Sequence, residues 1–249
     1  MEGGAATRGR AWYHAAHAAV CDVLEPWAHG TVVRATRYPS YYDFNVVRVE
    51  EDPAMSVEAL IAFADEALAG LAHRRVDFDL AAIAEPLRAG FESNAWKPQR
   101  LLWMRHQAPP PPGPGVSVEE VPYDAVHDLR VAWHGEDFPD QDPAAYHAQA
   151  REVALRRDAQ VLAVREDGIP VAFAQLERDR ATAEITQVYV HPDHRGGGRG
   201  TAITRAAIEA AANVRDLWIC ADDDNRPKEL YAGLGFRPSW TAMQFLRLP

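Results

Sequence analysis

The chain has 249 residues and a net charge of −10, with 47% hydrophobic and 25% charged residues. These values are typical of a globular protein with one large core or two smaller ones. The negative charge argues against nucleic acid or an anionic membrane as a general partner. No apolar run is long enough to span a bilayer, and the N-terminus does not resemble a signal peptide, so we expect a cytoplasmic protein.

The chain has two cysteines, Cys21 and Cys220, which lie far apart in apolar surroundings. This placement favours two buried thiols over a disulfide, which agrees with a reducing compartment. The spacing of cysteines and histidines matches no zinc site, and we expect no metal.

The first part of the chain contains alternating apolar segments. We predict strands at 45–49, 75–79 and 101–104, and helices at 57–71 and 81–89. A proline- and glycine-rich segment then follows at residues 108–115. Four consecutive prolines favour an extended polyproline conformation and exclude a helix or a central strand. We therefore predict a first domain at 1–107, a linker at 108–115 and a second domain at 116–249.

The second part begins with a predicted strand at 116–121 and a helix at 123–133, followed by an acidic loop. Asp142 and Pro143 are typical of a helix start, and that helix should continue to about Arg157. The remaining predicted elements are a hairpin of 160–165 and 171–176 around Asp167-Gly168, a strand at 183–190, a helix from 200 to 212, a strand at 217–221, a helix at 227–234 and a final strand at 241–248.

The run Arg195-Gly196-Gly197-Gly198-Arg199-Gly200 lies between the strand at 183–190 and an alanine-rich helix. A glycine loop that opens a helix presents several amides to one spot, and the helix dipole adds positive potential there. The sequence therefore predicts a phosphate-binding loop. The loop lacks the Lys-Ser or Lys-Thr pair of a P-loop and the acidic partner of a dinucleotide-binding motif.

Residues 195–200 resemble the Arg/Gln-x-x-Gly-x-Gly/Ala signature of the GNAT acyltransferase superfamily. The segment from Asn225 through Tyr231 to Gly235-Phe236 is similar to the last acetyl-CoA segment of that family. The resemblance covers about residues 116–249. It implies an α/β GNAT fold, with a mixed, mostly antiparallel central sheet flanked by helices.

The resemblance also implies that acetyl-CoA is the cosubstrate, with no metal. In this family the loop amides bind the pyrophosphate, and the preceding strand hydrogen-bonds the pantetheine arm through its backbone. Carried over by position, the residues that would bind acetyl-CoA are Val188, Tyr189, Val190, Arg195, Gly196, Gly197, Gly198, Arg199, Gly200, Thr201 and Asn225.

The first part resembles the second, because Gly90-Phe91 and its following strand echo Gly235-Phe236 and the final strand. The strands and helices before Gly90 also follow the order of those before Gly235, which predicts two GNAT-like units in tandem. At the position of the glycine loop the first unit has Glu50-Glu51-Asp52-Pro53. Three carboxylates would repel a pyrophosphate and Pro53 removes an amide, so we expect this degenerate unit to bind no CoA.

Acetyl transfer to an amine requires a base, since a free alkyl ammonium has a pKa near 10. Glu184 occupies the position at which several GNAT enzymes carry a catalytic glutamate, and strand alternation predicts that Glu184, Thr186, Val188 and Val190 share one face. Glu136, Asp137 and Asp140 in the acidic loop are alternatives that could steer or deprotonate a cationic substrate, and His134 is another candidate base.

Tyr231 matches the family tyrosine that protonates the departing CoA thiolate, and a phenol with a pKa near 10 suits that role. The sequence thus predicts an N-acetyltransferase for a small-molecule or peptide amine, with Tyr231 as acid and Glu184 as base. The alternatives are a non-catalytic acyl-CoA binding or sensing module and an interaction scaffold. The acceptor, and whether the chain is a monomer or a homodimer, stay open.

Overall fold

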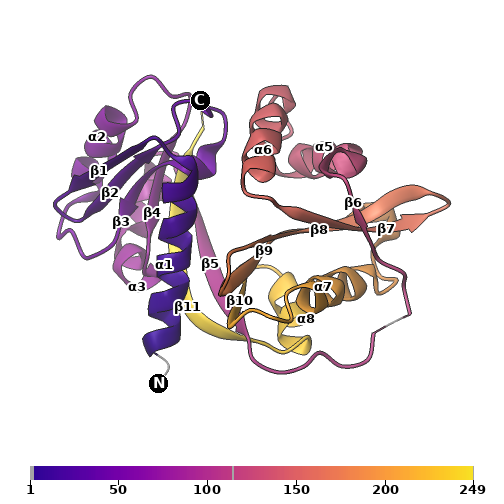
Figure 1. Cartoon of the computed structure of the whole chain (residues 1–249). Helices are drawn as coiled ribbons and strands as arrows, with labels where there is room; N and C mark the ends of the chain where they lie inside the picture. Colours follow the sequence, from indigo (N-terminus) through magenta and orange to yellow (C-terminus); the bar gives the residue numbers. More distant parts are fainter. Residues whose placement is uncertain (1–2, 114, 249) are drawn as a thin grey trace. The chain divides into compact units, whose positions relative to one another are not determined.

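The computed structural model describes residues 3–113 and 115–248 and divides them into two compact units (Figure 1). The first unit comprises 1–103, 221–225 and 239–249, and the second comprises 104–220 and 226–238. The units are therefore not the contiguous halves that the proline-rich segment predicts. The last strand of the chain explains most of the difference, because its larger part belongs to the first unit.

The first unit consists of a sheet with α1 on one face and α2 to α4 on the other. Its elements are α1 (Gly3–Val20), β1 (Val23–Trp27), β2 (Gly30–Arg34), η1 (Tyr42–Phe44), β3 (Asn45–Val49), α2 (Val57–Ala67), β4 (Arg74–Phe78), α3 (Ala81–Ala84), η2 (Glu85–Leu87), α4 (Arg88–Ser93), most of β5 (Lys97–His106) and most of β11 (Phe236–Arg247). The strand order is β1-β2-β3-β4-β11-β5. The helix predicted at 81–89 is broken into three short turns, since Pro86 cannot donate an intrahelical hydrogen bond.

One face of this sheet is apolar and is covered by α2 to α4. Strand β4 contributes Val76 and Phe78 to this face, and β11 contributes Phe245, whose ring stacks on Phe91 at 4.1 Å. All four of these side chains are almost completely buried. Their burial explains why the C-terminal strand packs in the first unit, antiparallel to β4.

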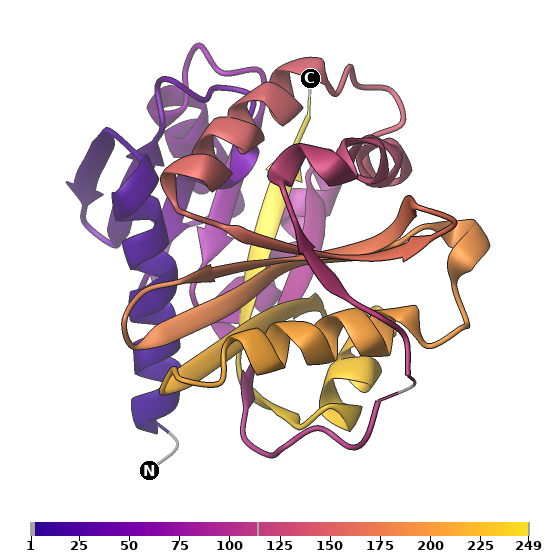
Figure 2. The same cartoon turned by 45° about the vertical axis from the view of Figure 1, so that its right-hand side comes forward.

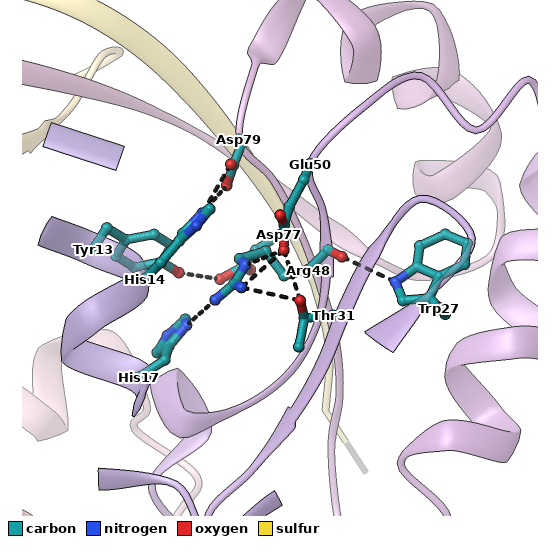
Figure 3. Close-up of polar contacts among 9 residues, drawn as sticks. All are labelled: Tyr13, His14, His17, Trp27, Thr31, Arg48, Glu50, Asp77 and Asp79. Carbon is teal, nitrogen blue, oxygen red and sulfur yellow. Dashed lines mark hydrogen bonds and ion pairs between the residues drawn. The ribbon is translucent and has the colours of Figure 1, made fainter. Parts of the chain in front are cut away.

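The opposite face of the same strands is polar and is covered by α1 (Figures 1 and 3). The Tyr13 hydroxyl donates to Asp77 at 2.8 Å, and His14 Nε2 lies 2.9 Å from an Asp79 oxygen. His17 is a buried residue of α1, with Nδ1 3.1 Å from an Arg48 nitrogen and Nε2 3.0 Å from the Asp43 carbonyl. Alternation along β4 produces this contrast, because odd-numbered residues there face α1 and even-numbered ones face the apolar core.

The second unit follows the element order that the sequence predicts. Its elements are β6 (Glu119–Val121), η3 (Tyr123–Val126), α5 (His127–Asp137), α6 (Ala144–Arg156), β7 (Gln160–Glu166), β8 (Ile169–Arg178), β9 (Thr182–Val190), η4 (Pro192–His194), α7 (Arg199–Ala210), most of β10 (Asp216–Asp222) and α8 (Pro227–Gly233). Strands β6 to β9 pair antiparallel, and β9 and β10 pair parallel. Helices α5 and α6 cover one face of these strands and α7 the other (Figure 2).

Most of the predicted elements of this unit are confirmed, including the β7–β8 hairpin, whose turn residues Asp167 and Gly168 both have positive φ. Two boundaries differ. The predicted acidic loop is shorter, because α5 continues through Asp137, and the first strand covers only Glu119–Val121. Asp142 accepts a hydrogen bond from the Ala144 amide, as expected at this helix start.

The two units share a parallel strand–helix–strand motif. In the first unit α2 connects the parallel pair β3 and β4, and in the second α7 connects the parallel pair β9 and β10. In both units the first strand of this parallel pair also pairs antiparallel with the strand that precedes it in the chain, β2 with β3 and β8 with β9. The internal repeat predicted from the sequence is thus present in the topology. No helix within 3–113 and 115–248 is long and apolar enough to cross a bilayer, and Cys21 and Cys220 are free thiols.

The buried imidazole of His17 predicts an acid-sensitive first unit. Burial, with the nearby Arg48 and Arg75 guanidinium groups, lowers the pKa of His17 to about 3. Because this folded-state pKa lies below the unfolded value of about 6.5, the stabilising neutral form is fully present above pH 6.5 and stability is lost as the pH falls. At pH 5 the loss from this residue is about 2 kcal/mol.

Substitution His17→Gln should remove that component of the pH dependence. Urea unfolding at pH 7.5 and pH 5 would measure it, and the free energy of unfolding should fall less in the variant than in the wild type. Equal losses in the two proteins would contradict this assignment.

Candidate functional site

The glycine loop between β9 and α7 is a cradle of backbone amides. Gly196 and Gly198 adopt left-handed conformations, with φ of 85° and 77°, and Gly198 is the N-cap of α7. The amides of residues 196–198 make no backbone hydrogen bond within the described part of the chain. The first amides of a helix have no intrahelical partner either, so consecutive donors from Gly196 to Thr201 are available to an anion.

Close packing fixes the position of this cradle. A Cβ atom added at Gly200 would lie 3.2 Å from Leu230 Cδ1 of α8 and 3.7 Å from Val190 Cγ2 of β9. Glycine at 200 therefore lets the first turn of α7 approach both elements. The side of β9 that carries Val190 faces α7.

The two arginines of the loop are both engaged by carboxylates. Arg195 pairs with Glu136 of α5 at 2.9 Å, and its Nε donates to the Val190 carbonyl at 3.0 Å. Arg199 pairs with Glu166 of the β7–β8 hairpin and donates to the His194 carbonyl at 2.9 Å. The amides and the helix dipole therefore provide the uncompensated positive potential of this loop.

Strand β9 contains a β-bulge that changes which side chains share a face. Gln187 pairs with Gln175 and Ile185 pairs with Leu176, so Thr186 has no partner of its own on β8. The predicted shared face of Glu184, Thr186, Val188 and Val190 is wrong for this reason. Val190 lies on the α7 side, whereas Glu184 lies on the α5–α6 side, next to Glu177 of β8.

A buried polar chain lines the α5–α6 side of β8 and β9. Arg130 of α5 is only 4% exposed and donates to the side chains of Gln187 and Gln175, the latter at 3.0 Å. Gln175 donates to Glu177, and Glu177 pairs with Arg157 at the end of α6. Glu184 is 9% exposed and makes polar contacts of its own.

The aromatic surroundings of Arg130 stabilise its charge. Its guanidinium lies 4.0 Å from the Tyr123 ring centroid and 4.6 Å from that of Phe173. Arg130, Gln175 and Gln187 were not among the residues predicted from the sequence. A single arginine in a predicted amphipathic helix is normally solvent-exposed, so its residue type did not mark Arg130 as part of a buried polar chain. The available signal was the position of Arg130 between two apolar residues, Leu129 and Val131, in the predicted helix.

The last turn of α5 carries the two acidic residues that the sequence proposed for the substrate. Partial burial opposes ionisation of Glu136, but hydrogen bonds from Tyr189 and Arg195 outweigh it and lower its pKa. Partial burial and the neighbouring Glu136 raise the pKa of Asp137. Of the two carboxyl groups, Asp137 has the more basic carboxylate.

His134 lies on the same helix and packs in an aromatic cluster between α5 and α6. Its ring stacks on Tyr146 at 5.0 Å and meets His147 at 5.5 Å. Burial lowers the pKa of His134, and burial with the adjacent imidazoles lowers the pKa of His147 to about 4. Both imidazoles are therefore neutral at pH 7. No set of three His, Cys, Asp or Glu residues within the described ranges is placed to hold a metal.

Tyr231 lies on α8, which also packs on the first turn of α7 through Leu230. Its side chain is 7% exposed, and its hydroxyl has no hydrogen-bond partner among the described residues. Burial and the nearby Cys220 raise the pKa of this phenol, so it is protonated at neutral pH. A protonated hydroxyl without a protein acceptor can donate a proton to a bound group.

The remaining predicted cofactor residue, Asn225, belongs to the first unit. Its amide donates to the Asp222 carbonyl in a turn that also holds Asp223, whose amide donates to the Arg100 carbonyl. The other predicted residues from 184 to 201, together with Glu136, Asp137 and Tyr231, all belong to the second unit.

Comparison with known proteins agrees with this geometry. Residues 123–236 match the Acetyltransferase (GNAT) family. An uncharacterized N-acetyltransferase of Methanocaldococcus jannaschii is 32% identical over 106 residues, a match that covers 38% of this chain and 46% of that protein. The match thus spans less than half of that relative's length.

Solved structures show the same fold over most of the chain. A functionally unknown conserved protein from Staphylococcus epidermidis matches with a TM-score of 0.72 and 15% identity, covering 92% of this chain and 94% of that one. A GCN5-related N-acetyltransferase from Sphaerobacter thermophilus matches with a TM-score of 0.52 and 15% identity, and the match covers 81% of this chain and 73% of that one. A tandem GNAT protein from the clavulanic acid biosynthesis pathway matches with a TM-score of 0.51 and 17% identity, and the match covers 82% of this chain and 75% of that one.

The fold and the glycine loop define an acyltransferase-like domain preceded by a related unit. Residues 123–236 thus form a GNAT-type domain, and the chain shares the fold of a solved tandem GNAT protein.

The buried Arg130 predicts a measurable effect on stability. Substitution Arg130→Met keeps much of the side-chain volume but leaves the oxygens of Gln175 and Gln187 without a charged donor. The free energy of unfolding of the second unit should fall by about 2–3 kcal/mol. Arg151→Met is the matched control, because the Arg151–Asp124 ion pair is exposed to solvent and should contribute little to the free energy of unfolding. Equal effects in urea unfolding would contradict the role given to Arg130.

Proposed function

We propose that the chain transfers the acetyl group of acetyl-CoA to a primary amine of a small molecule or peptide. The observation that carries this proposal is the amide cradle at the start of α7, formed by left-handed Gly196 and Gly198. The match of residues 123–236 to the Acetyltransferase (GNAT) family supports an acetyltransferase, and the amide cradle supports a diphosphate-bearing donor.

The donor would bind along β9 and the loop. The diphosphate accepts hydrogen bonds from the amides of residues 196–201, and the backbone of Val188 and Val190 contacts the pantetheine arm. The bulge at Thr186 supports this arrangement, because it disrupts regular pairing on β9 and leaves backbone groups for other partners. A free backbone amide of this strand would polarise the thioester carbonyl.

In the transfer, the amine nitrogen attacks the thioester carbonyl carbon, so that a C–N bond forms and the C–S bond breaks. The amine must first lose a proton to a base. Glu184 is our first candidate, because it is buried on the side of β9 that faces α5 and α6. Asp137 is the alternative, and its raised pKa favours proton acceptance near neutral pH.

The departing thiolate takes its proton from Tyr231, and the proton that the attacking nitrogen loses as the amide forms restores the phenol. Support for this role comes from the protonated state of the phenol and from the packing of α8 against the first turn of α7. We keep a non-catalytic acyl-CoA binding module as the second candidate, since the amide cradle alone supports binding without transfer.

Two measurements separate these functions. Titration calorimetry with acetyl-CoA measures binding, and release of CoA thiol in the presence of polyamines, amino sugars, amino acids and peptides measures transfer. Binding with thiol release on at least one amine supports the transferase. Binding without release on any amine would favour the binding module, and absence of binding would contradict both.

The cradle predicts a strong effect of one small substitution. Gly198→Ala introduces a Cβ at a left-handed position, which costs about 1–2 kcal/mol or turns the amides away. The Kd for CoA should rise at least about 10-fold. Gly233→Ala is the matched control, since that glycine is helical and a Cβ there meets no atom within 4 Å. Unchanged CoA affinity in Gly198→Ala would contradict the proposed phosphate site.

Loss of the Tyr231 hydroxyl should affect turnover more than binding. Tyr231→Phe is expected to lower kcat about 100-fold or more with little change in KM for acetyl-CoA, because general-acid catalysis operates in the chemical step. Tyr123→Phe serves as control, because it removes a phenol but leaves the ring beside Arg130. A Tyr231→Phe variant with wild-type kcat at saturating acetyl-CoA would remove this residue from the mechanism.

A further inference from the structure

Side chains from three elements of the second unit meet at the end of α5. The Tyr189 hydroxyl of β9 donates to Glu136 Oε1 at 2.6 Å. An Arg195 nitrogen of the glycine loop lies 3.2 Å from the same oxygen and 2.9 Å from Oε2. We call this set the Tyr189–Glu136–Arg195 contact.

The contact ties three parts of the site through short, directional bonds. Arg195 Nε donates to the carbonyl of Val190, the last residue of β9, and its guanidinium lies 5.9 Å from the Tyr189 ring centroid. Trp133 lies one turn before Glu136 on α5, and its ring stacks on the Tyr189 ring with the centroids 5.9 Å apart. Movement of the glycine loop therefore moves Arg195, whose guanidinium is bonded to Glu136 on the last turn of α5.

The second arginine of the loop makes a contrasting contact. Arg199 pairs with Glu166, which also accepts from His194 at 2.9 Å, and Glu166 belongs to the β7–β8 hairpin. Within the described part of the second unit, the ion pairs of the loop thus reach α5 only through Glu136. The loop therefore makes two ion pairs of the same chemical type, of which Arg195–Glu136 reaches α5 and Arg199–Glu166 reaches the β7–β8 hairpin.

Exposure limits the energy of these contacts. The side chains of Arg195 and Glu136 are 53% and 38% exposed, so their ion pair alone stabilises by about 1 kcal/mol or less. Tyr189 is only 4% exposed and anchors Glu136 from the interior. The contact is therefore strong enough to bias the last turn of α5 and weak enough to respond to a ligand at the loop.

We propose that Glu136 is a positioning residue that couples acetyl-CoA at the 195–200 loop to the order of the last turn of α5. This inference rests on the proposed function, because it requires that acetyl-CoA binds the loop. That turn carries Asp137, and α5 covers the side of β9 that carries Glu184. The acceptor side of the enzyme is thus completed when the donor is bound.

Hydrogen exchange of the peptide covering residues 133–140 tests the coupling without a known acceptor. The amide of Phe138, which donates to the His134 carbonyl at 2.7 Å, reports on the last turn. Saturating CoA should slow exchange in this peptide about 5-fold or more in the wild type. In Glu136→Gln the slowing should fall below about 2-fold although CoA still binds.

Glu166→Gln is the matched control, because it removes the carboxylate partner of the other loop arginine. It should keep the CoA-dependent slowing in residues 133–140. Arg195→Gln should lose it, and the double variant Glu136→Gln/Arg195→Gln should lose no more than either single variant. Exchange that is unchanged or faster on adding CoA to the wild type, or slowing retained in Glu136→Gln, would overturn the coupling.

Calorimetry on the same samples separates the two hypotheses. Absence of CoA binding to the wild type would overturn the proposed function and this inference together. CoA binding without slowed exchange in the wild type would overturn this inference alone.

Discussion

A left-handed backbone at the entry to α7 is the constraint on which the candidate site depends. Gly198 caps the helix with φ of 77°, and Gly200 lets its first turn contact Val190 and Leu230. This conformation leaves a series of amides unpaired at the positive end of a helix dipole. In an acidic chain with both loop arginines paired to carboxylates, these dipoles are the local source of uncompensated positive potential.

The bulge at Thr186 gives the two sides of β9 different chemistry. It turns Glu184 and Gln187 to the α5–α6 side, where Arg130 and Glu177 form a buried polar chain. The α7 side instead packs Val190 against the glycine loop. A donor along the strand and an acceptor beneath α5 would therefore meet different environments on one strand, which suits a two-substrate reaction.

The first unit uses the same topology with opposite chemistry. After β3 it has Glu50, whose carboxylate accepts from Arg48 and Thr31, where the second unit has glycines. The sheet face beneath α1 is closed by hydrogen-bonded side chains, including Tyr13 with Asp77 (Figure 3). Satisfied buried groups of this kind have little capacity left for a ligand.

The sequence by itself determined the element order, the internal repeat and the glycine loop, because these depend on local periodicity and on residues with special backbone freedom. The resemblance to the GNAT superfamily also indicated Tyr231 and Glu184 as candidate acid and base. Only the tertiary structure decided that Glu184 and Val188 lie on opposite sides of β9, since one unpaired residue inverts the alternation that a sequence pattern assumes. It likewise decided that Arg130 is buried, that Glu136 holds Arg195 and that β11 joins β4. These features depend on contacts between residues far apart in the chain, which no local pattern encodes.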